Sequence, residues 1–165
     1  MKWNVAKCHL ITTEKAQTSV TLGNDTIVST PKINLLGLSI DNKLTFSEHV
    51  LKLCRKGNQK FHALARISKY LDNNKLKNIM NAFIKSQFKD CSLIWMYHNR
   101  TLNNKINRLH ERSLRLIHRN FNGTFQDLLK IENDFTIHER NLQKLAIEMY
   151  KVKNHLSPTL IQGLF

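Results

Sequence analysis

The sequence predicts an α+β fold, with short antiparallel strands at the N-terminus followed by a mostly α-helical, thumb-like bundle. Two observations lead to this prediction. Up to residue 45, short apolar stretches alternate with polar residues and are separated by Gly, Asn and Asp, which is typical of strands and turns. From residue 46 onward, apolar residues recur every three or four positions, which indicates amphipathic helices. We therefore divide the chain into a β segment, residues 1–45, and a helical segment, residues 46–165.

The β segment contains four candidate strands. Residues 8–13 form the first, and residues 18–22 and 26–30 form a hairpin around Gly23-Asn24-Asp25. Residues 33–40 are expected to form one last strand, with Gly37 inside it, where a glycine weakens a sheet unless a backbone or a ligand comes close. Strands this few and this short make a poor core by themselves.

The helical segment begins after the turn residues Asp41-Asn42, with Thr45 or Ser47 as the helix cap. Thr136 and Glu139 have the spacing of a capping box at the start of the last helix. The expected helices cover residues 47–70, residues 74–89 or on to 98, residues 101 or 103 to 119, residues 124–130 and residues 136–154.

The positive charge is concentrated in the middle of the chain. The 165 residues carry a net charge of +14, and residues 49–119 alone hold sixteen Lys or Arg against three acidic residues, a net +13. Such a block is expected of a surface that binds a polyanion, RNA or DNA above all. The alternative is a solvated face that only keeps the protein in solution.

Two basic stripes lie within this block. Arg108, Arg112, Arg115 and Arg119 follow i, i+4, i+7, i+11 spacing, so they lie within about 60° of one another on a helix. Arginine makes forked hydrogen bonds to phosphate, which suits a contact with the nucleic-acid backbone. The alternative is internal pairing with acidic residues, for which Glu111, Glu139 and Glu148 are the candidates. Lys52, Lys56 and Lys60 form the second stripe, on the first helix.

Several other classes of function lack support in the sequence. No run of 18 uninterrupted apolar residues occurs, so we expect no membrane partner. The three cysteines are isolated, so no zinc site is expected, and free thiols fit an intracellular location, cytoplasmic or nuclear. No glycine-rich phosphate loop or nucleophile motif occurs, and we expect no metal ion, no cofactor and no small-molecule substrate.

Short motifs along nearly the whole chain resemble one protein family in the same order. They are residues 3–8 (Trp-Asn-Val-Ala-Lys-Cys), residues 35–49 with the pair Leu36-Gly37, residues 103–112 (Asn-Asn-Lys-Ile-Asn-Arg-Leu-His-Glu-Arg) and residues 137–142 (Ile-His-Glu-Arg-Asn-Leu). Together they resemble the reverse transcriptases of non-LTR retrotransposons of the jockey-like lineage, from the end of the palm to the helices that follow the thumb.

This resemblance implies a role in holding template and primer. Leu36 and Gly37 match the primer grip, the lysine stripe belongs to the thumb, and Lys7 matches a lysine thought to donate a proton to the leaving pyrophosphate. RNA or an RNA–DNA duplex is the implied partner. The family binds two Mg²⁺ ions on a paired-aspartate turn upstream of the Asn-x-x-Lys motif, and this chain has no Asp-Asp pair.

We therefore expect a truncated C-terminal part of such an enzyme, which by itself does not polymerise. The two Mg²⁺ ions are expected only in the full-length enzyme. Two alternatives remain: a small basic helical module that binds nucleic acid without enzymatic activity, and a degenerate reading frame without a selected function.

Overall fold

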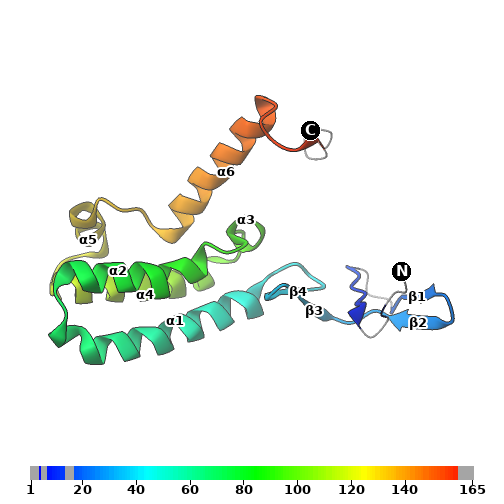
Figure 1. Ribbon diagram of the computed structural model, residues 1–165, viewed down its shortest axis with the longest axis horizontal. Helices are drawn as coiled ribbons and strands as arrows, with labels where there is room; N and C mark the ends of the chain where they lie inside the picture. Colours follow the sequence, from blue (N-terminus) through cyan, green and yellow to red (C-terminus); the bar gives the residue numbers. More distant parts are fainter. Residues whose placement is uncertain (1–3, 5–6, 14–16, 160–165) are drawn as a thin grey trace. The chain divides into compact units, whose positions relative to one another are not determined.

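The computed structural model describes residue 4 and residues 7–13 and 17–159, and its strands and helices confirm the predicted α+β class (Figure 1). The chain divides into two compact units, Met1–Lys52 and Leu53–Phe165. The division falls inside the first helix, α1 (Ser47–Ile67), so the first residues of this helix belong to the same unit as the strands.

The first hairpin of the N-terminal unit pairs β1 (Ser19–Leu22) with β2 (Asp25–Val28) in antiparallel register. Leu22 lies opposite Asp25, so Gly23 and Asn24 form a two-residue turn. Gly23 has a φ of 66°, which is the conformation that the first position of a type II′ turn requires. The predicted hairpin is therefore confirmed, with a turn one residue shorter than expected.

The second hairpin corrects the prediction of a single strand over residues 33–40. Here β3 (Lys32–Leu35) pairs with β4 (Leu38–Asp41), and Leu35 lies opposite Leu38. Leu36 and Gly37 form the turn, with φ angles of 49° and 89°. Positive φ at both positions is the signature of a type I′ turn, in which Asn-Gly is the usual pair. Leucine is not a usual residue at the first position of such a turn. The sequence therefore gives no sign of a turn here.

The prediction of a strand over residues 8–13 is also wrong. In the described part of this segment, Leu10 forms a single parallel bridge with Ser29, and the Thr30 backbone N–H donates to the Leu10 carbonyl over 2.9 Å. In the motif at residues 3–8, Trp3, Val5 and Ala6 lie outside the described residues. Lys7 is exposed, and its backbone N–H donates to the Asn4 carbonyl over 3.0 Å.

The loop between β4 and α1 is organised by Asp41. Its carboxylate accepts hydrogen bonds from the backbone N–H groups of Lys43, Thr45 and Phe46, at 3.1, 3.1 and 2.8 Å, and from the Thr45 hydroxyl at 3.1 Å. Burial opposes ionisation of Asp41, but these hydrogen bonds outweigh it and lower its pKa. The Thr45 hydroxyl accepts from the Ser47 N–H over 3.3 Å, so Thr45 acts near the helix start as predicted, but as part of the Asp41 loop.

Two further contacts attach the second hairpin to the first turn of α1. The Ser39 N–H donates to Nδ1 of the buried His49 over 3.3 Å. The Lys32 ammonium lies 3.0 Å from the Glu48 carboxylate, although both side chains are largely exposed. Exposed ion pairs add little stability, so the buried histidine is the stronger of the two attachments.

The remaining helices form the second unit. After α1 the chain makes the 3₁₀ turn η2 (Ser68–Tyr70), followed by α2 (Asn73–Phe83), the 3₁₀ turn η3 (Lys85–Phe88), α3 (Ser92–Trp95), α4 (Arg100–His118), α5 (Phe125–Glu132) and α6 (Ile137–Lys153). The side chains of Asp72, Asn99, Thr124 and Thr136 accept backbone hydrogen bonds at the starts of α2, α4, α5 and α6. The capping box predicted at Thr136 and Glu139 is present, and Thr124 forms a second one with Asp127.

The second predicted helix is interrupted. It ends at Phe83 instead of continuing to Lys89 or His98, and the chain then turns sharply, with a left-handed φ of 46° at Cys91. Ile84, Phe88, Trp95 and Met96 lie on both sides of this break and are buried, each at most 3% exposed. Ile84, Phe88 and Trp95 would also share one face of a continuous helix, so the helical periodicity does not reveal the break.

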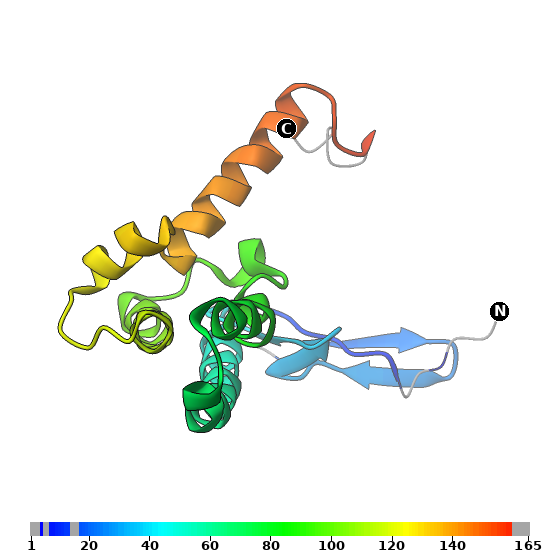
Figure 2. The same ribbon diagram turned by 60° about the vertical axis from the view of Figure 1, so that its left-hand side comes forward.

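The core of the second unit lies between α1, α2 and α4, which run side by side in Figures 1 and 2. Gly57 allows the close approach of α1 and α4, because a Cβ atom at this position would lie 2.5 Å from Cδ2 of the buried Leu109. The same two views show α6 projecting from these helices, and its apolar residues Ile147, Met149 and Tyr150 remain more than half exposed.

Candidate nucleic-acid interface

In the predicted lysine stripe on α1, two side chains are exposed and the third contacts the end of α2. Lys52 and Lys56 are exposed; Lys52 belongs to the first unit and Lys56 to the second. Lys60 is half-buried, and its ammonium donates to the Phe83 carbonyl over 3.2 Å and lies 5.8 Å from the centre of the Phe83 ring. Lys60 therefore links α1 to the end of α2 and is less available than Lys56 for a phosphate.

The arginine stripe on α4 divides in the same way. Arg108 and Arg112 are exposed. The Arg112 guanidinium lies 4.5 Å above the centre of the Phe61 ring, and one of its nitrogens donates to Asn58 Oδ1 over 3.1 Å. These contacts hold Arg112 in one place while leaving it accessible, so less conformational entropy is lost when it binds a phosphate.

Arg115 and Arg119 are engaged within the protein. Arg115 is half-buried and pairs with Glu111 over 2.7 Å, and it also donates to the Phe121 carbonyl. Arg119 is exposed, takes a left-handed φ of 52° at the C-terminal cap of α4, and donates to the Leu71 carbonyl over 3.4 Å. Internal pairing, the alternative that the sequence left open, is thus realised for Arg115 through Glu111.

The lysine and arginine stripes face different sides of α1. Arg112 reaches α1 at Asn58, whereas Lys60 reaches α2, and these two α1 residues lie about 160° apart around the helix axis. The exposed α1 residue nearest in angle to Asn58 on the preceding turn is Arg55, about 60° away. The two predicted stripes therefore do not merge into one surface.

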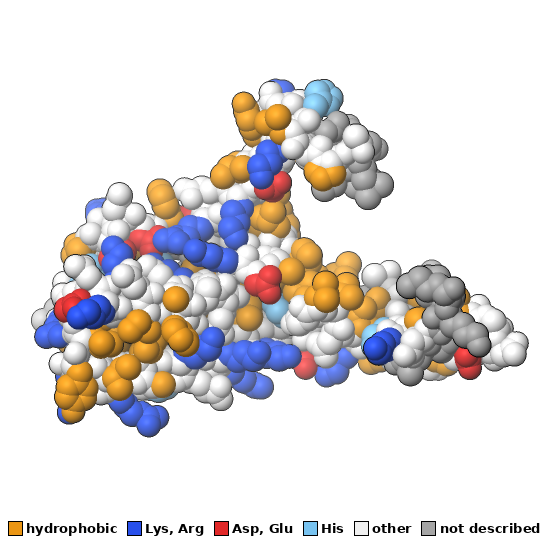
Figure 3. Space-filling view, in the orientation of Figure 1, with side chains coloured by type: hydrophobic (Ala, Val, Ile, Leu, Met, Phe, Trp, Pro, Cys, Tyr) orange, Lys and Arg blue, Asp and Glu red, His pale blue; other side chains and the backbone are white. Residues whose placement is uncertain are grey.

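Four basic residues of α1 and α4 form a different group. We call it the α1–α4 basic surface, and its members are Arg55, Lys105, Arg108 and Arg112. All four side chains are exposed. The α4 members lie within about 60° of one another around the helix axis. Burial raises the pKa of the Cys54 thiol on α1, and Lys105 lies close enough to oppose this rise. Residues 49–71 contain no Asp or Glu, and Glu111 is occupied by Arg115, so no described carboxylate neutralises this surface. Figure 3, in the view of Figure 1, shows Lys and Arg side chains along α1 and α2 with few acidic side chains near them.

Arg55 and Lys105 were not among the predicted site residues. Arg55 lies on the polar side of α1, but nothing in the sequence shows which part of that side adjoins α4. That information comes from the contact of Gly57 with Leu109, which sets how the two helices lie together.

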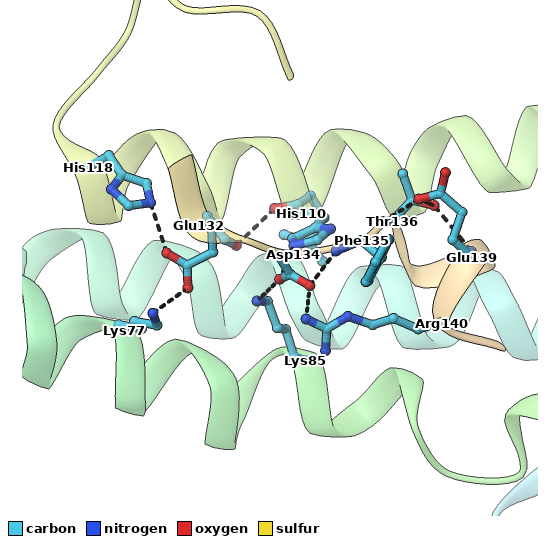
Figure 4. Close-up of polar contacts among 12 residues, drawn as sticks. Lys77, Lys85, His110, His118, Glu132, Asp134, Phe135, Thr136, Glu139 and Arg140 are labelled. Atoms are coloured by element: carbon cyan, nitrogen blue, oxygen red, sulfur yellow. Dashed lines mark hydrogen bonds and ion pairs between the residues drawn. The ribbon is translucent and has the colours of Figure 1, made fainter. Parts of the chain in front are cut away.

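No pattern in the sequence indicates a second feature of the helical unit, a buried ionic cluster (Figure 4). The Asp134 side chain is 3% exposed, and its carboxylate contacts Arg140 and lies 2.5 Å from the Lys85 ammonium. The neighbouring Glu132, 5% exposed, pairs with Lys77 and His118, each over 2.9 Å. Asn133 takes a left-handed φ of 52° at the end of α5, and this turn directs Asp134 inward. The residues of the cluster come from separate parts of the sequence, between Lys77 and Arg140, so no spacing rule indicates it.

Burial sets the protonation of the groups in this cluster. Desolvation, followed by repulsion from Arg140, lowers the pKa of Lys85 to about 8. Desolvation and the cations Lys85 and Arg140 lower the pKa of His110 to about 3. His110 Nε2 lies 3.6 Å from Asp134, but both ring nitrogens lack hydrogen-bond partners in the described structure. Because Asp134 already has two cationic partners, we infer that His110 is neutral and forms no ion pair.

Burial also opposes the ionisation of Glu132, but the hydrogen bond from Lys77 and the surrounding cations outweigh it and lower the pKa of this carboxyl group. The buried Glu132 carboxylate is therefore charged, and cations lie beside both buried carboxylates. Breaking such a pair would leave an uncompensated charge in the interior, so the cluster fixes how α5 and α6 pack on η3 and α2.

The residues that the structure describes contain no group of three or more His, Cys, Asp or Glu side chains arranged to hold a metal ion. Within the same residues, no helix combines the length and the apolarity needed to cross a bilayer. Comparisons of the chain with protein families, with curated proteins and with solved structures found no match.

Proposed function

We propose that the chain binds RNA or an RNA–DNA duplex through the phosphate backbone, as the template–primer-gripping C-terminal part of a reverse transcriptase of a non-LTR retrotransposon. The observation that carries the binding proposal is the α1–α4 basic surface, in which four exposed cations from two helices lie together without a neutralising carboxylate. Contacts of this kind fix a protein on a nucleic acid with little regard to base sequence. The ordered motifs of the sequence support the assignment to the enzyme family.

The second hairpin gives separate support to the primer-grip assignment. Leu36 is 94% exposed at the tip of the hairpin and takes a left-handed φ of 49°. Both properties are unfavourable for a leucine in an isolated turn. Strained and exposed side chains are commoner at contact sites, and in the proposed enzyme this tip would lie against the primer.

A small nucleic-acid-binding module without enzymatic activity is the second candidate. The observation that favours it is the compact helical unit, Leu53–Phe165, which has its own buried core and carries most of the positive charge. Both candidates use the same α1–α4 basic surface. They differ in whether the β unit contributes to binding. Leu36→Asn therefore weakens duplex binding only if the chain is part of a reverse transcriptase.

The test of binding is a series of single substitutions, each assayed on several RNA and RNA–DNA sequences over a range of salt concentrations. Arg108→Gln and Arg112→Gln each remove one exposed cation. We expect each variant to bind all sequences more weakly, with the log–log salt slope lower by about one unit, because one phosphate contact is lost. Arg115→Gln should leave the slope unchanged, since Arg115 is paired with Glu111.

Lys130→Gln is the matched control. It removes an exposed positive charge from α5, outside the α1–α4 basic surface, and should leave affinity and slope at the values of the parent protein. If Arg108→Gln and Arg112→Gln behave like this control, the α1–α4 basic surface does not contact nucleic acid.

A further inference from the structure

Two adjoining cavities flank the buried carboxylate of Asp134, on a part of the helical unit separate from the α1–α4 basic surface. Their volumes are about 320 and 290 Å³. Lys85, Lys89, Asn133, Asp134 and Arg140 line both of them. The larger is big enough for a phosphate group together with part of the molecule that carries it.

The cations in these walls outnumber the carboxylates. Lys85, Lys89, Arg140 and Lys144 line the larger cavity against Asp134 alone, which leaves a net charge of +3. The smaller cavity adds Lys77 and Glu132 to the shared residues, which leaves +2. A concave site with excess positive charge concentrates anions.

The hydrogen-bond donors in the walls are only partly used. The Asp134 carboxylate accepts hydrogen bonds from the Lys85 ammonium and from one terminal nitrogen of Arg140. The other guanidinium nitrogens of Arg140 and the ammonium of Lys89 have no partner within the described part of the chain, and the Arg140 side chain is 32% exposed. An arginine held by a carboxylate on one edge presents its other edge for a forked contact.

The charges on this wall also repel one another. The Arg140 guanidinium contributes, after burial, to the lowered pKa of Lys85, and burial lowers the pKa of Arg140 itself. A bound anion would relieve this repulsion by stabilising the charged forms of both groups.

We propose that this pocket between η3 and the start of α6 binds a phosphate group, with Lys89 and the free edge of Arg140 as the contacting groups and Asp134 as the residue that positions Arg140. A dianionic phosphate monoester matches the excess charge of the walls best. The group can be the 5′ end of a nucleic acid or can belong to a free phosphate-containing molecule, and the experiment below separates the two. The inference does not rest on the proposed function, because it concerns a different surface.

The first arm of the test titrates the full-length protein with inorganic phosphate by calorimetry at constant ionic strength, with chloride as the comparison anion. We expect saturable binding of phosphate only. Lys89→Gln should weaken it about tenfold, the lower end of the effect of removing one charge-assisted hydrogen bond. Lys89 is exposed and its side chain has no partner in the described structure, so this variant should fold normally.

The matched control is Lys153→Gln, which removes an exposed charge from the same helix as Arg140, about 20 Å further along its axis. This variant should bind phosphate like the parent protein. Absence of saturable phosphate binding, or equal affinities of the parent and Lys89→Gln, would overturn the proposal.

The second arm identifies the source of the phosphate by comparing one oligonucleotide with a 5′-phosphate or a 5′-hydroxyl. A preference for the 5′-phosphate that disappears in Lys89→Gln assigns the pocket to a nucleic-acid end. Equal binding of the two oligonucleotides, together with phosphate binding in the first arm, assigns it to a free phosphate-containing molecule. Arg108→Gln separates this proposal from the preceding one, because it should weaken oligonucleotide binding but leave inorganic phosphate binding intact.

Discussion

Acidification should destabilise the protein through the buried His110. His110 is 3% exposed, it packs edge-on against Phe125 at a ring-centre distance of 5.6 Å, and its folded-state pKa is about 3 compared with an unfolded value of 6.5. A histidine whose pKa is lowered by folding takes up a proton more readily in the unfolded chain. The contribution of His110 to stability is therefore fully present well above pH 6.5 and is lost as the pH drops from 6.5 toward 3.

The size of the effect follows from the two pKa values. A pKa difference of one unit corresponds to about 1.4 kcal/mol. The loss from His110 is about 2 kcal/mol at pH 5 and about 4 kcal/mol near pH 3, relative to pH 7.5. Since a domain of this size is typically stable by only about 5–15 kcal/mol, the effect is large enough to measure.

The assay is urea denaturation followed by circular dichroism, at pH values from 7.5 to 4.5. His110→Phe keeps an aromatic ring beside Phe125 but cannot take up a proton, so its free energy of unfolding should change much less over this range. His62→Gln removes an exposed histidine of α1 and should reproduce the pH dependence of the parent protein. If His110→Phe retains the full pH dependence, a group other than His110 is responsible, and our assignment of a neutral His110 is wrong.

Two further predictions concern the backbone. Gly57→Ala should lower the free energy of unfolding by about 1–3 kcal/mol in urea denaturation, because the new methyl group would lie 2.5 Å from Leu109 Cδ2; an unchanged midpoint would show that the contact between α1 and α4 can relax. Leu36→Asn should stabilise the second hairpin by up to about 1 kcal/mol, since Asn tolerates the left-handed conformation that Leu36 adopts. Slower amide exchange in β3 and β4 is the expected result, and faster exchange would contradict the assigned turn.

The elements that the sequence predicted correctly are those with local causes. The turn at Gly23 follows from the conformational freedom of glycine, and the capping box at Thr136 follows from the spacing of Thr and Glu. The apolar face of α1 follows from its 3.6-residue periodicity, and Val50, Cys54, Phe61 and Leu64 on that face are all buried. Each of these signals lies within a few residues of the feature that it specifies.

The incorrect predictions concern places where the local pattern of residues does not reveal a turn or a break. The helical periodicity of the second predicted helix continues through the buried Phe88 and Trp95, so it does not reveal the left-handed turn at Cys91. The hairpin turn at Leu36 breaks the usual turn chemistry, so the alternation of apolar residues suggested one continuous strand.

By itself, the sequence determined the fold class, the helix starts and the location of the positive charge, since these depend on residue type and local spacing. The tertiary structure decided which charges are available. It fixed Arg112 on Phe61 and placed Arg55 on the side of α1 where Arg112 makes its contact. The pair of Arg115 with Glu111, by contrast, has the local i,i+4 spacing of a helix. The tertiary structure also brought Lys85, Asp134 and Arg140 together in the interior, from η3, from the loop after α5 and from α6. The physical reason is that a charge costs little in water wherever it lies in the sequence, whereas in the folded protein its role depends on the partner and the burial that packing provides.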